Sequence, residues 1–135
     1  PLFRDKRLLL RALEKVYDSL TNTINAILQY EYIQKRIKLH KNDPRANLKT
    51  FVEKCAQKYL ISKEEMNDIQ NFLSLFEDHK KSSMEFQRKD KVVILSDNLS
   101  ISLIDLEKLK KYLFLVKRVL QKVQITIISQ FTLSQ

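Results

Sequence analysis

The chain has 135 residues, 44% of them hydrophobic, and a formal net charge of +9, which fits one globular domain and excludes a disordered polypeptide. It contains no glycine, although average usage would give about nine in this length. Because phosphate-cradling loops and tight hairpin turns rely on glycine, P-loop and dinucleotide-binding folds are excluded, and long helices joined by few turns are expected.

The cysteine, the histidines and the length of the apolar runs limit the cellular compartment and the chemistry that can be expected of the protein. A single cysteine, Cys55, excludes an intrachain disulfide, is typical of a reducing cytosol, and is expected to be a buried small hydrophobe. His40 and His79 stand in no metal-ligand spacing, so neither a metal nor another cofactor is expected. There is no run of about 18 apolar residues and no signal peptide, which predicts a cytoplasmic protein without a membrane partner.

The first predicted element is one long helix from Phe3 to about Lys41, or two helices with a slight break between them. The residues "HKNDPR" are expected to end it, because Asn and Asp favour turns and Pro44 disfavours helix at the residue before it. The apolar residues of this helix recur at steps of three and four, the period of one helix face: Leu9, Leu13, Val16, Leu20, Ile24, Ile27, Leu28, Ile33 and Ile37.

Two shorter helices are predicted next. One runs from Arg45 to Leu60 and has one apolar face. The other begins at Ser62, because Ser62 and Glu65 have the spacing of a capping box, in which each side chain satisfies a backbone N–H of the other residue. This helix is expected to end near residues 79–81, where basic side chains suit the negative end of the helix dipole.

The stretch "MEFQRKDKVVILSDN" is the part of the chain that favours strands over helix. A short β-hairpin is predicted at about 85–95, in which Glu85–Arg88 pairs with Val92–Leu95. A lone hairpin is marginally stable in water, so one of its sides must dock on the helices or on a second copy of the chain. The side chains expected to dock are Phe86, Val93 and Leu95.

The last predicted helix starts near Ser102 and Asp105 and is the most regular one. For the apolar tail, residues 125–135, three alternatives stay open: a continued helix, packing back on the core, or a flexible tail. An apolar seam with alternating steps of three and four is predicted to form either an interface between molecules or one wall of an intramolecular bundle. Its residues are Leu106, Leu109, Leu113, Val116, Leu120, Val123 and Ile127.

Together these elements predict one all-α domain over residues 1–135. Its expected fold is an antiparallel bundle of four to five helices, with a long first helix and the short hairpin before the last one.

Basic side chains cluster in two places that are expected to bind an anion or a nucleic acid. The first is the stretch "RIKLHKNDPR", in which Arg36 and His40 would share one face of the predicted helix and set a proton-transferring imidazole beside a phosphate-binding guanidinium. The second is the bend of the hairpin. The candidate cations are Arg36, Lys38, Lys41 and Arg45 in the first cluster, and Arg88, Lys89 and Lys91 in the second.

Several antiparallel helices, a long first helix and the pair Arg36/His40 in a basic setting make the chain resemble the HEPN superfamily of small helical-bundle domains. Members of that superfamily are commonly dimeric; some are RNA-cleaving toxins and others are partners of minimal nucleotidyltransferases. Their catalytic motif is Arg, four to six residues, then His, whereas three residues separate Arg36 from His40 here. The resemblance therefore implies a binding member rather than a nuclease.

We expect a non-enzymatic helical interaction module with a basic surface that forms a homo-oligomer, most simply a homodimer. The expected partner is a nucleic acid or a nucleotide-handling protein. Two alternatives stay open. One is a metal-independent ribonuclease of the HEPN type that uses Arg36 and His40, with Lys38 or Lys41 holding phosphate. The other is a coiled-coil-like adaptor that uses the seam Leu106–Ile127.

Overall fold

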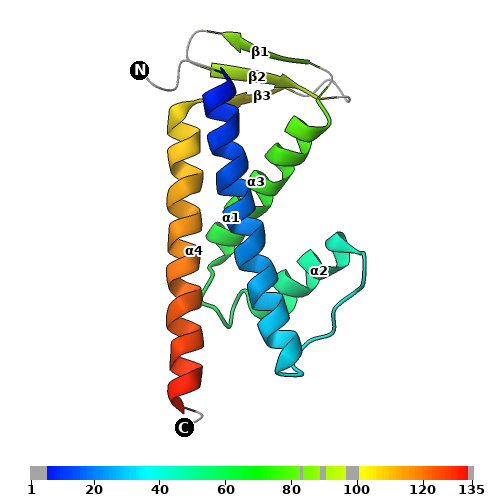
Figure 1. Cartoon of the computed structure of the whole chain (residues 1–135), viewed down its shortest axis with the longest axis vertical. Coiled ribbons are helices and arrows are strands. Elements are labelled where there is room, and N and C mark those ends of the chain that lie inside the picture. The colour runs from blue at the N-terminus through cyan, green and yellow to red at the C-terminus, as the bar shows by residue number, and fades with distance from the viewer. Residues whose placement is uncertain (1–5, 83, 89–90, 97–100, 134–135) are drawn as a thin grey trace.

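A computed structural model of the chain describes residues 6–82, 84–88, 91–96 and 101–133. The predicted helix start at Phe3 lies outside these ranges. Within these ranges, four α-helices and a π-helical segment, η2, contain most of the residues, and a three-stranded sheet covers one end (Figure 1). In chain order the elements are α1 (Lys6–Ile33), α2 (Pro44–Thr50), η2 (Phe51–Cys55), α3 (Lys63–Lys80), β1 (Met84–Arg88), β2 (Lys91–Leu95), β3 (Ile101–Ile104) and α4 (Leu106–Leu133).

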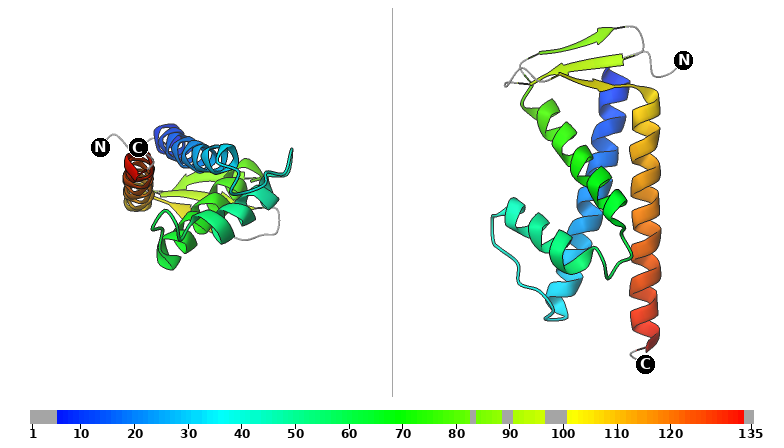
Figure 2. Two further views of the ribbon diagram at one scale, coloured as in Figure 1. Left: turned by 90° about the horizontal axis from the view of Figure 1, so that it is seen from below. Right: turned by 180° about the vertical axis from the view of Figure 1, so that it is seen from behind.

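The two long helices, α1 and α4, lie side by side and run in the same direction, away from the sheet (Figures 1 and 2). Near the sheet, Lys6 Nζ donates to the backbone carbonyl of Glu85 in β1 at 3.1 Å; at the far end, the Tyr30 hydroxyl donates to Gln130 Oε1 at 3.0 Å. The prediction of an antiparallel bundle is therefore wrong for this pair. The reason is that the chain runs back to the sheet along α3 and passes through the strands before α4 begins. Helix α4 therefore starts at the same end of the molecule as α1.

The first helix ends at Ile33 rather than at the predicted Lys41. Lys35 takes a left-handed backbone conformation with φ of 62°, and the Arg36 N–H donates to the Glu31 carbonyl at 3.0 Å. This is the arrangement of a Schellman C-cap, which usually has glycine at the left-handed position. A side chain there costs about 1 kcal/mol. The glycine-free sequence carried no signal for this stop.

The predicted second helix, Arg45–Leu60, is divided into α2, η2 and a turn. Asp43 caps α2, because its Oδ1 accepts from the Ala46 N–H at 3.1 Å. In η2 the Ala56 N–H donates to the carbonyl of Phe51, five residues earlier, which is the π-helical pattern. Single π-turns of this kind occur often at functional sites.

The third helix confirms its predicted start. The Glu65 N–H donates to Ser62 Oγ at 3.0 Å and the Ser62 N–H donates to Glu65 Oε1 at 2.9 Å, so both bonds of the capping box are present. The helix ends at Lys80, as expected. His79 Nδ1 lies 2.8 Å from Glu85 Oε2, and this contact joins the end of α3 to β1.

The predicted hairpin is confirmed: β1 and β2 pair in antiparallel register. Its docked side differs from the prediction. Val92 and Ile94 are buried against the helices, whereas Val93 and Leu95 are half-buried; the side chain of Phe86 lies outside the described part. Because successive side chains of a strand point to opposite faces, an error in the predicted face assigns every side chain of the strand to the wrong side of the sheet.

A third strand, β3, pairs antiparallel with β2 and was not predicted. Ser102, which was expected near the start of the last helix, lies in this strand. Helix α4 starts at Leu106, and Asp105 Oδ1 accepts from the Lys108 N–H at 2.8 Å, so Asp105 is its N-cap.

The predicted seam of α4 divides between core and surface. Leu113 and Leu120 are 45% and 42% exposed, so they do not belong to the core. Of the three alternatives for the tail, the continued helix holds through Leu133, and residues 134–135 lie outside the described part. The buried residues of α4 are Leu109, Tyr112, Leu115, Val116, Val119 and Val123, with Leu106 and Ile127 partly buried beside them.

The core lies where α1, α3 and α4 meet below the sheet. Phe72 of α3 stacks on Tyr112 of α4 with ring centroids 4.3 Å apart, and Tyr17 of α1 stacks on Phe76 of α3 at 3.8 Å. Cys55 is buried, as predicted. These aromatic stacks connect the helices that position the surface described next.

Candidate functional site

Cationic side chains gather around a depression of about 370 Å³ between the loop that follows α1 and the segment formed by α2 and η2. Four of the lining residues are positively charged and one, Glu53, is acidic. Glu53 pairs only weakly with Lys49, at 3.9 Å. The polar and charged lining residues are Lys35, Arg36, Lys38, His40, Thr50, Glu53 and Lys54.

Arg36 is held at this depression by the buried carboxylate of Glu31. Arg36 Nε and Nη2 lie 3.1 and 3.0 Å from Glu31 Oε2, and Lys58 Nζ lies 2.7 Å from Glu31 Oε1. Arg36 Nη2 also donates to Gln130 Oε1 of α4 at 2.9 Å. The Glu31 side chain is 2% exposed, whereas that of Arg36 is 42% exposed. The loop is therefore anchored to α1 and α4 while its guanidinium stays accessible.

The other end of the loop is held by Asn47 of α2. The His40 N–H donates to Asn47 Oδ1 at 2.8 Å, and Asn47 Nδ2 donates to the His40 carbonyl at 2.9 Å. Asn42 takes φ of 61°, a conformation that asparagine tolerates. The prediction that Arg36 and His40 share a helix face is wrong, because α1 ends at Ile33; they line the same depression from an anchored loop.

Two buried groups lie near the Glu31 carboxylate. Burial and the charge of Glu31 raise the pKa of the Cys55 thiol to about 11 and also raise the pKa of the Tyr59 hydroxyl. Both groups are therefore protonated near neutral pH, and neither supplies an anionic nucleophile.

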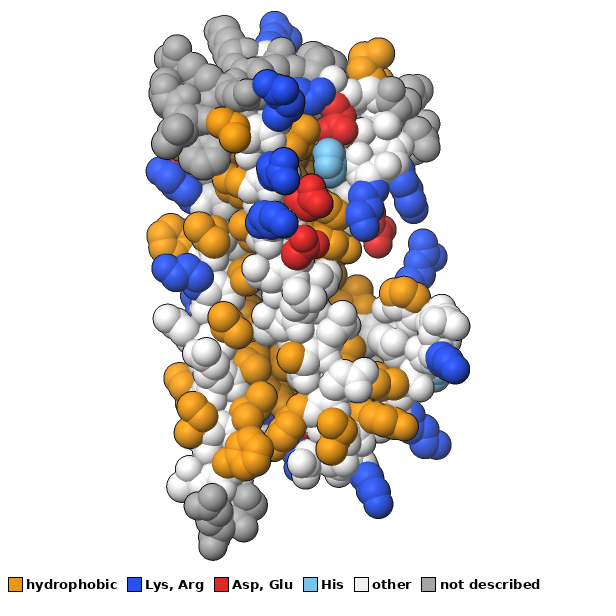
Figure 3. All heavy atoms as spheres, in the orientation of Figure 1, with side chains coloured by type: hydrophobic (Ala, Val, Ile, Leu, Met, Phe, Trp, Pro, Cys, Tyr) orange, Lys and Arg blue, Asp and Glu red, His pale blue; other side chains and the backbone are white. Residues whose placement is uncertain are grey.

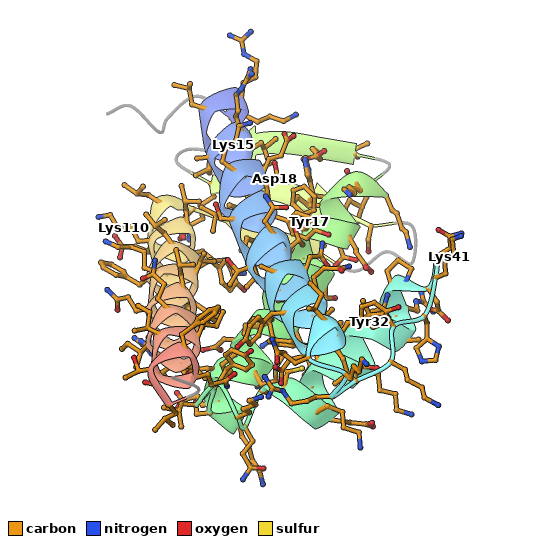
Figure 4. The ribbon with its side chains drawn as sticks, turned by 60° about the horizontal axis from the view of Figure 1, so that its bottom comes forward. Lys15, Tyr17, Asp18, Tyr32, Lys41 and Lys110 are labelled. Atoms are coloured by element: carbon orange, nitrogen blue, oxygen red, sulfur yellow. The ribbon has the colours of Figure 1, made fainter. Side chains whose placement is uncertain are left out.

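The other predicted cations lie away from this depression. Lys41 lies at the outer edge of the loop (Figure 4), and Arg45 lines a separate depression of about 360 Å³ among α1, α2 and α3. Arg88 and Lys91 are exposed on the hairpin, at the other end of the molecule (Figure 1), and Lys89 lies outside the described ranges. The two predicted basic clusters therefore do not meet.

The predicted interface residues of α4 are also divided. This helix stands at one edge of the molecule (Figure 2), and apolar side chains reach the surface over it (Figure 3). Leu113 and Leu120 are exposed there. Leu109, Val116 and Val123 are buried in the core of the same chain, so they are not available to another molecule.

Three important residues of the depression escaped prediction from the sequence. Lys35 and Lys54 line it, and Glu31 holds Arg36 in place. Lys54 is far from the loop along the chain, and only the fold brings η2 beside it. Within the described ranges, no group of three or more His, Cys, Asp and Glu side chains is placed to hold a metal ion.

Comparisons with known proteins found no match, so the function has to be inferred from the chemistry of the site. No family model matches the chain, and neither does any curated protein or solved structure. No described helix combines the length and the apolar character that crossing a bilayer requires.

Proposed function

We propose that this chain is a non-enzymatic binding module whose basic depression takes the phosphate backbone of a nucleic acid. The observation that carries the proposal is the convergence of Lys35, Arg36, Lys38 and Lys54 on one depression whose lining includes one acidic residue, Glu53. A nucleic acid presents negative charges at short, regular spacing, and cations that contact them release bound counterions, which drives association.

The kinds of side chain in the depression support this choice of ligand. Arg36 uses its Nε and Nη2 donors on Glu31 and Gln130, so it would reach a phosphate through Nη1, and these bonds hold it in place and reduce the entropy lost on binding. Lys38 and Lys54 are exposed point charges that can follow neighbouring phosphates. Contacts of this kind carry no base specificity, so binding is expected to be largely independent of sequence.

The double variant Lys38→Ala/Lys54→Ala tests the proposal. It is expected to bind a short single-stranded RNA more weakly than the unmodified chain does. The magnitude of the slope of log affinity against log salt is expected to fall by about 1.4, because each lysine would otherwise neutralise one phosphate of the single strand. Both side chains are exposed, so the fold should be unaffected. Fluorescence anisotropy at several salt concentrations measures both quantities, and single-stranded DNA is compared with the RNA.

A matched control is the double variant Lys15→Ala/Lys110→Ala. It removes the same charge from exposed positions on α1 and α4, away from the depression (Figure 4). The control is expected to keep most of the affinity and the salt slope. Equal losses in the two doubles, or no RNA binding at low salt, would refute the proposal. Binding of an acidic polypeptide without binding of RNA would assign the depression to a protein partner instead.

A second candidate is a metal-independent ribonuclease of the HEPN type, which is favoured by the presence of Arg36 and His40 in the same depression. The His40 imidazole would move a proton at a ribose hydroxyl, and Arg36 would stabilise charge on the phosphate, with Lys38 holding it. His40→Ala should then abolish cleavage of a generic RNA while its RNA affinity stays nearly the same. Cleavage at the unmodified rate, or none in the unmodified chain, removes this candidate.

A further inference from the structure

One side of α4 exposes large apolar side chains along most of the helix. We call Leu113, Phe114, Leu120, Ile125 and Ile128 the outer face of α4; their exposed fractions range from 42% to 64%. They lie on the side of α4 away from its buried stripe. Monomeric proteins rarely keep an extended apolar strip in water, and such strips commonly mark interaction surfaces.

The charges of α4 are distributed unevenly along its length. Between Leu106 and Lys122 it carries six basic residues and one acidic residue, whereas residues 123–135 carry no charge at all. Several of these cations contact α3: Lys111 and Arg118 lie near Asp68 and Glu65. Lys110 and Lys117 point elsewhere: Lys110 Nζ lies 3.8 Å from Glu107 Oε1, and Lys117 Nζ lies 5.9 Å from the centroid of the Phe114 ring.

We infer that two copies of the chain pair through the outer faces of α4, with the two helices antiparallel. A parallel pair would bring the basic halves together and place Lys117 beside its own copy, where like charges repel. An antiparallel pair places each basic half against the uncharged half of the partner. It also brings these lysines near the negative end of the other helix dipole.

The spacing of the outer face suits this arrangement. An antiparallel pair centred beside Leu120 sets Leu113 opposite Ile128 of the partner and Lys117 opposite Gln124 of the partner, since these residues are equally far from the centre. In this register the apolar Leu113 meets the apolar Ile128, and Lys117 meets the neutral amide of Gln124. The inference is independent of the nucleic-acid proposal, because the pairing and the basic depression use different side chains.

Two substitutions at Gln124, which is exposed, test the inference without disturbing the core. Sedimentation of the unmodified chain is expected to show an equilibrium between the monomer of 16.1 kDa and a dimer of twice that mass. At low salt Gln124→Glu should tighten the dimer about fivefold, because by symmetry each new carboxylate pairs with Lys117 of the other copy, and Gln124→Lys should weaken it by a similar factor. Both effects should vanish near 1 M salt, which screens exposed charges.

Each alternative result overturns the inference in a recognisable way. In a parallel dimer residue 124 faces itself, so both substitutions would weaken association. If neither changes the dissociation constant, a different surface forms the dimer. A chain that stays monomeric at all concentrations removes the interface altogether. Circular dichroism of the two variants, expected to match the unmodified chain, confirms that folding is not the cause of any change.

Discussion

Replacing Glu31 by alanine is expected to lower the free energy of unfolding by about 3 kcal/mol, the cost of removing one partner from a buried ion pair. The Glu31 carboxylate is 2% exposed and holds both Arg36 and Lys58. Those two side chains keep 42% and 30% exposure, so they can turn toward water, and the expected loss falls at the low end for such pairs. Urea unfolding followed by circular dichroism measures the change.

Glu53→Ala is the matched control for this experiment. Glu53 is 54% exposed and lies 3.9 Å from Lys49, so its removal should change the stability by less than about 0.5 kcal/mol. Similar losses in the two variants would show that Glu31 does not anchor the loop. Glu31→Ala should also weaken RNA binding by more than its loss of stability alone would explain, because Arg36 loses its fixed position.

Lysine substitutions three residues apart on α4 are expected to have very different effects. Val116 is 5% exposed in the core, so Val116→Lys buries an unpaired charge and should cost on the order of 4 kcal/mol, a large part of the roughly 5–15 kcal/mol that ordinarily stabilises a domain. Leu113 is 45% exposed, so Leu113→Lys should cost less than about 1 kcal/mol and leave the fold intact.

Thermal unfolding distinguishes these variants, and sedimentation adds a second comparison. Leu113→Lys should remain helical while its association is weakened, because it brings a charge into the outer face of α4. If Leu113→Lys lowers the melting temperature as much as Val116→Lys does, Leu113 is part of the core of the folded chain. If neither variant lowers it substantially, the buried stripe of α4 is not where we place it.

The helix ends show what the sequence could predict and what it could not. Side-chain caps follow local patterns, so the capping box of Ser62 and Glu65 was correctly predicted. The left-handed stop at Lys35, with φ of 62°, was missed because glycine, the usual signal, is absent, whereas Leu60, with φ of 60°, lies where the second helix was predicted to end. Tertiary contacts, such as the bond from Arg36 to Gln130 and the bond from Lys122 to the Leu60 carbonyl, offset the local cost there.

The choice of buried face was the second limit of prediction. The apolar arc of α4 is wide enough for two stripes, and a regular three-four spacing favoured the one through Leu113 and Leu120. Packing instead selected the stripe centred on Tyr112 and Val119, because Phe72 of α3 stacks on Tyr112. Periodicity identifies that a helix is amphipathic, but the neighbouring elements decide its rotation.

The candidate site was predicted in part. Arg36, Lys38 and His40 lie close together in the sequence, so this basic cluster could be predicted. Lys54 and Glu31 come from other elements, so their place in the site depends on how η2 and α1 pack. No local pattern indicated the π-helical turn at Phe51–Cys55 that carries Lys54.

The most direct test of the central proposal is a titration of isotope-labelled protein with a short single-stranded RNA, followed by amide chemical shifts. At low salt the largest changes are predicted in residues 35–40 and 50–54, and they should disappear as the salt concentration rises. Changes concentrated instead on the hairpin around Arg88 and Lys91, or none at any RNA concentration, would contradict a phosphate-binding depression between the α1 loop and η2.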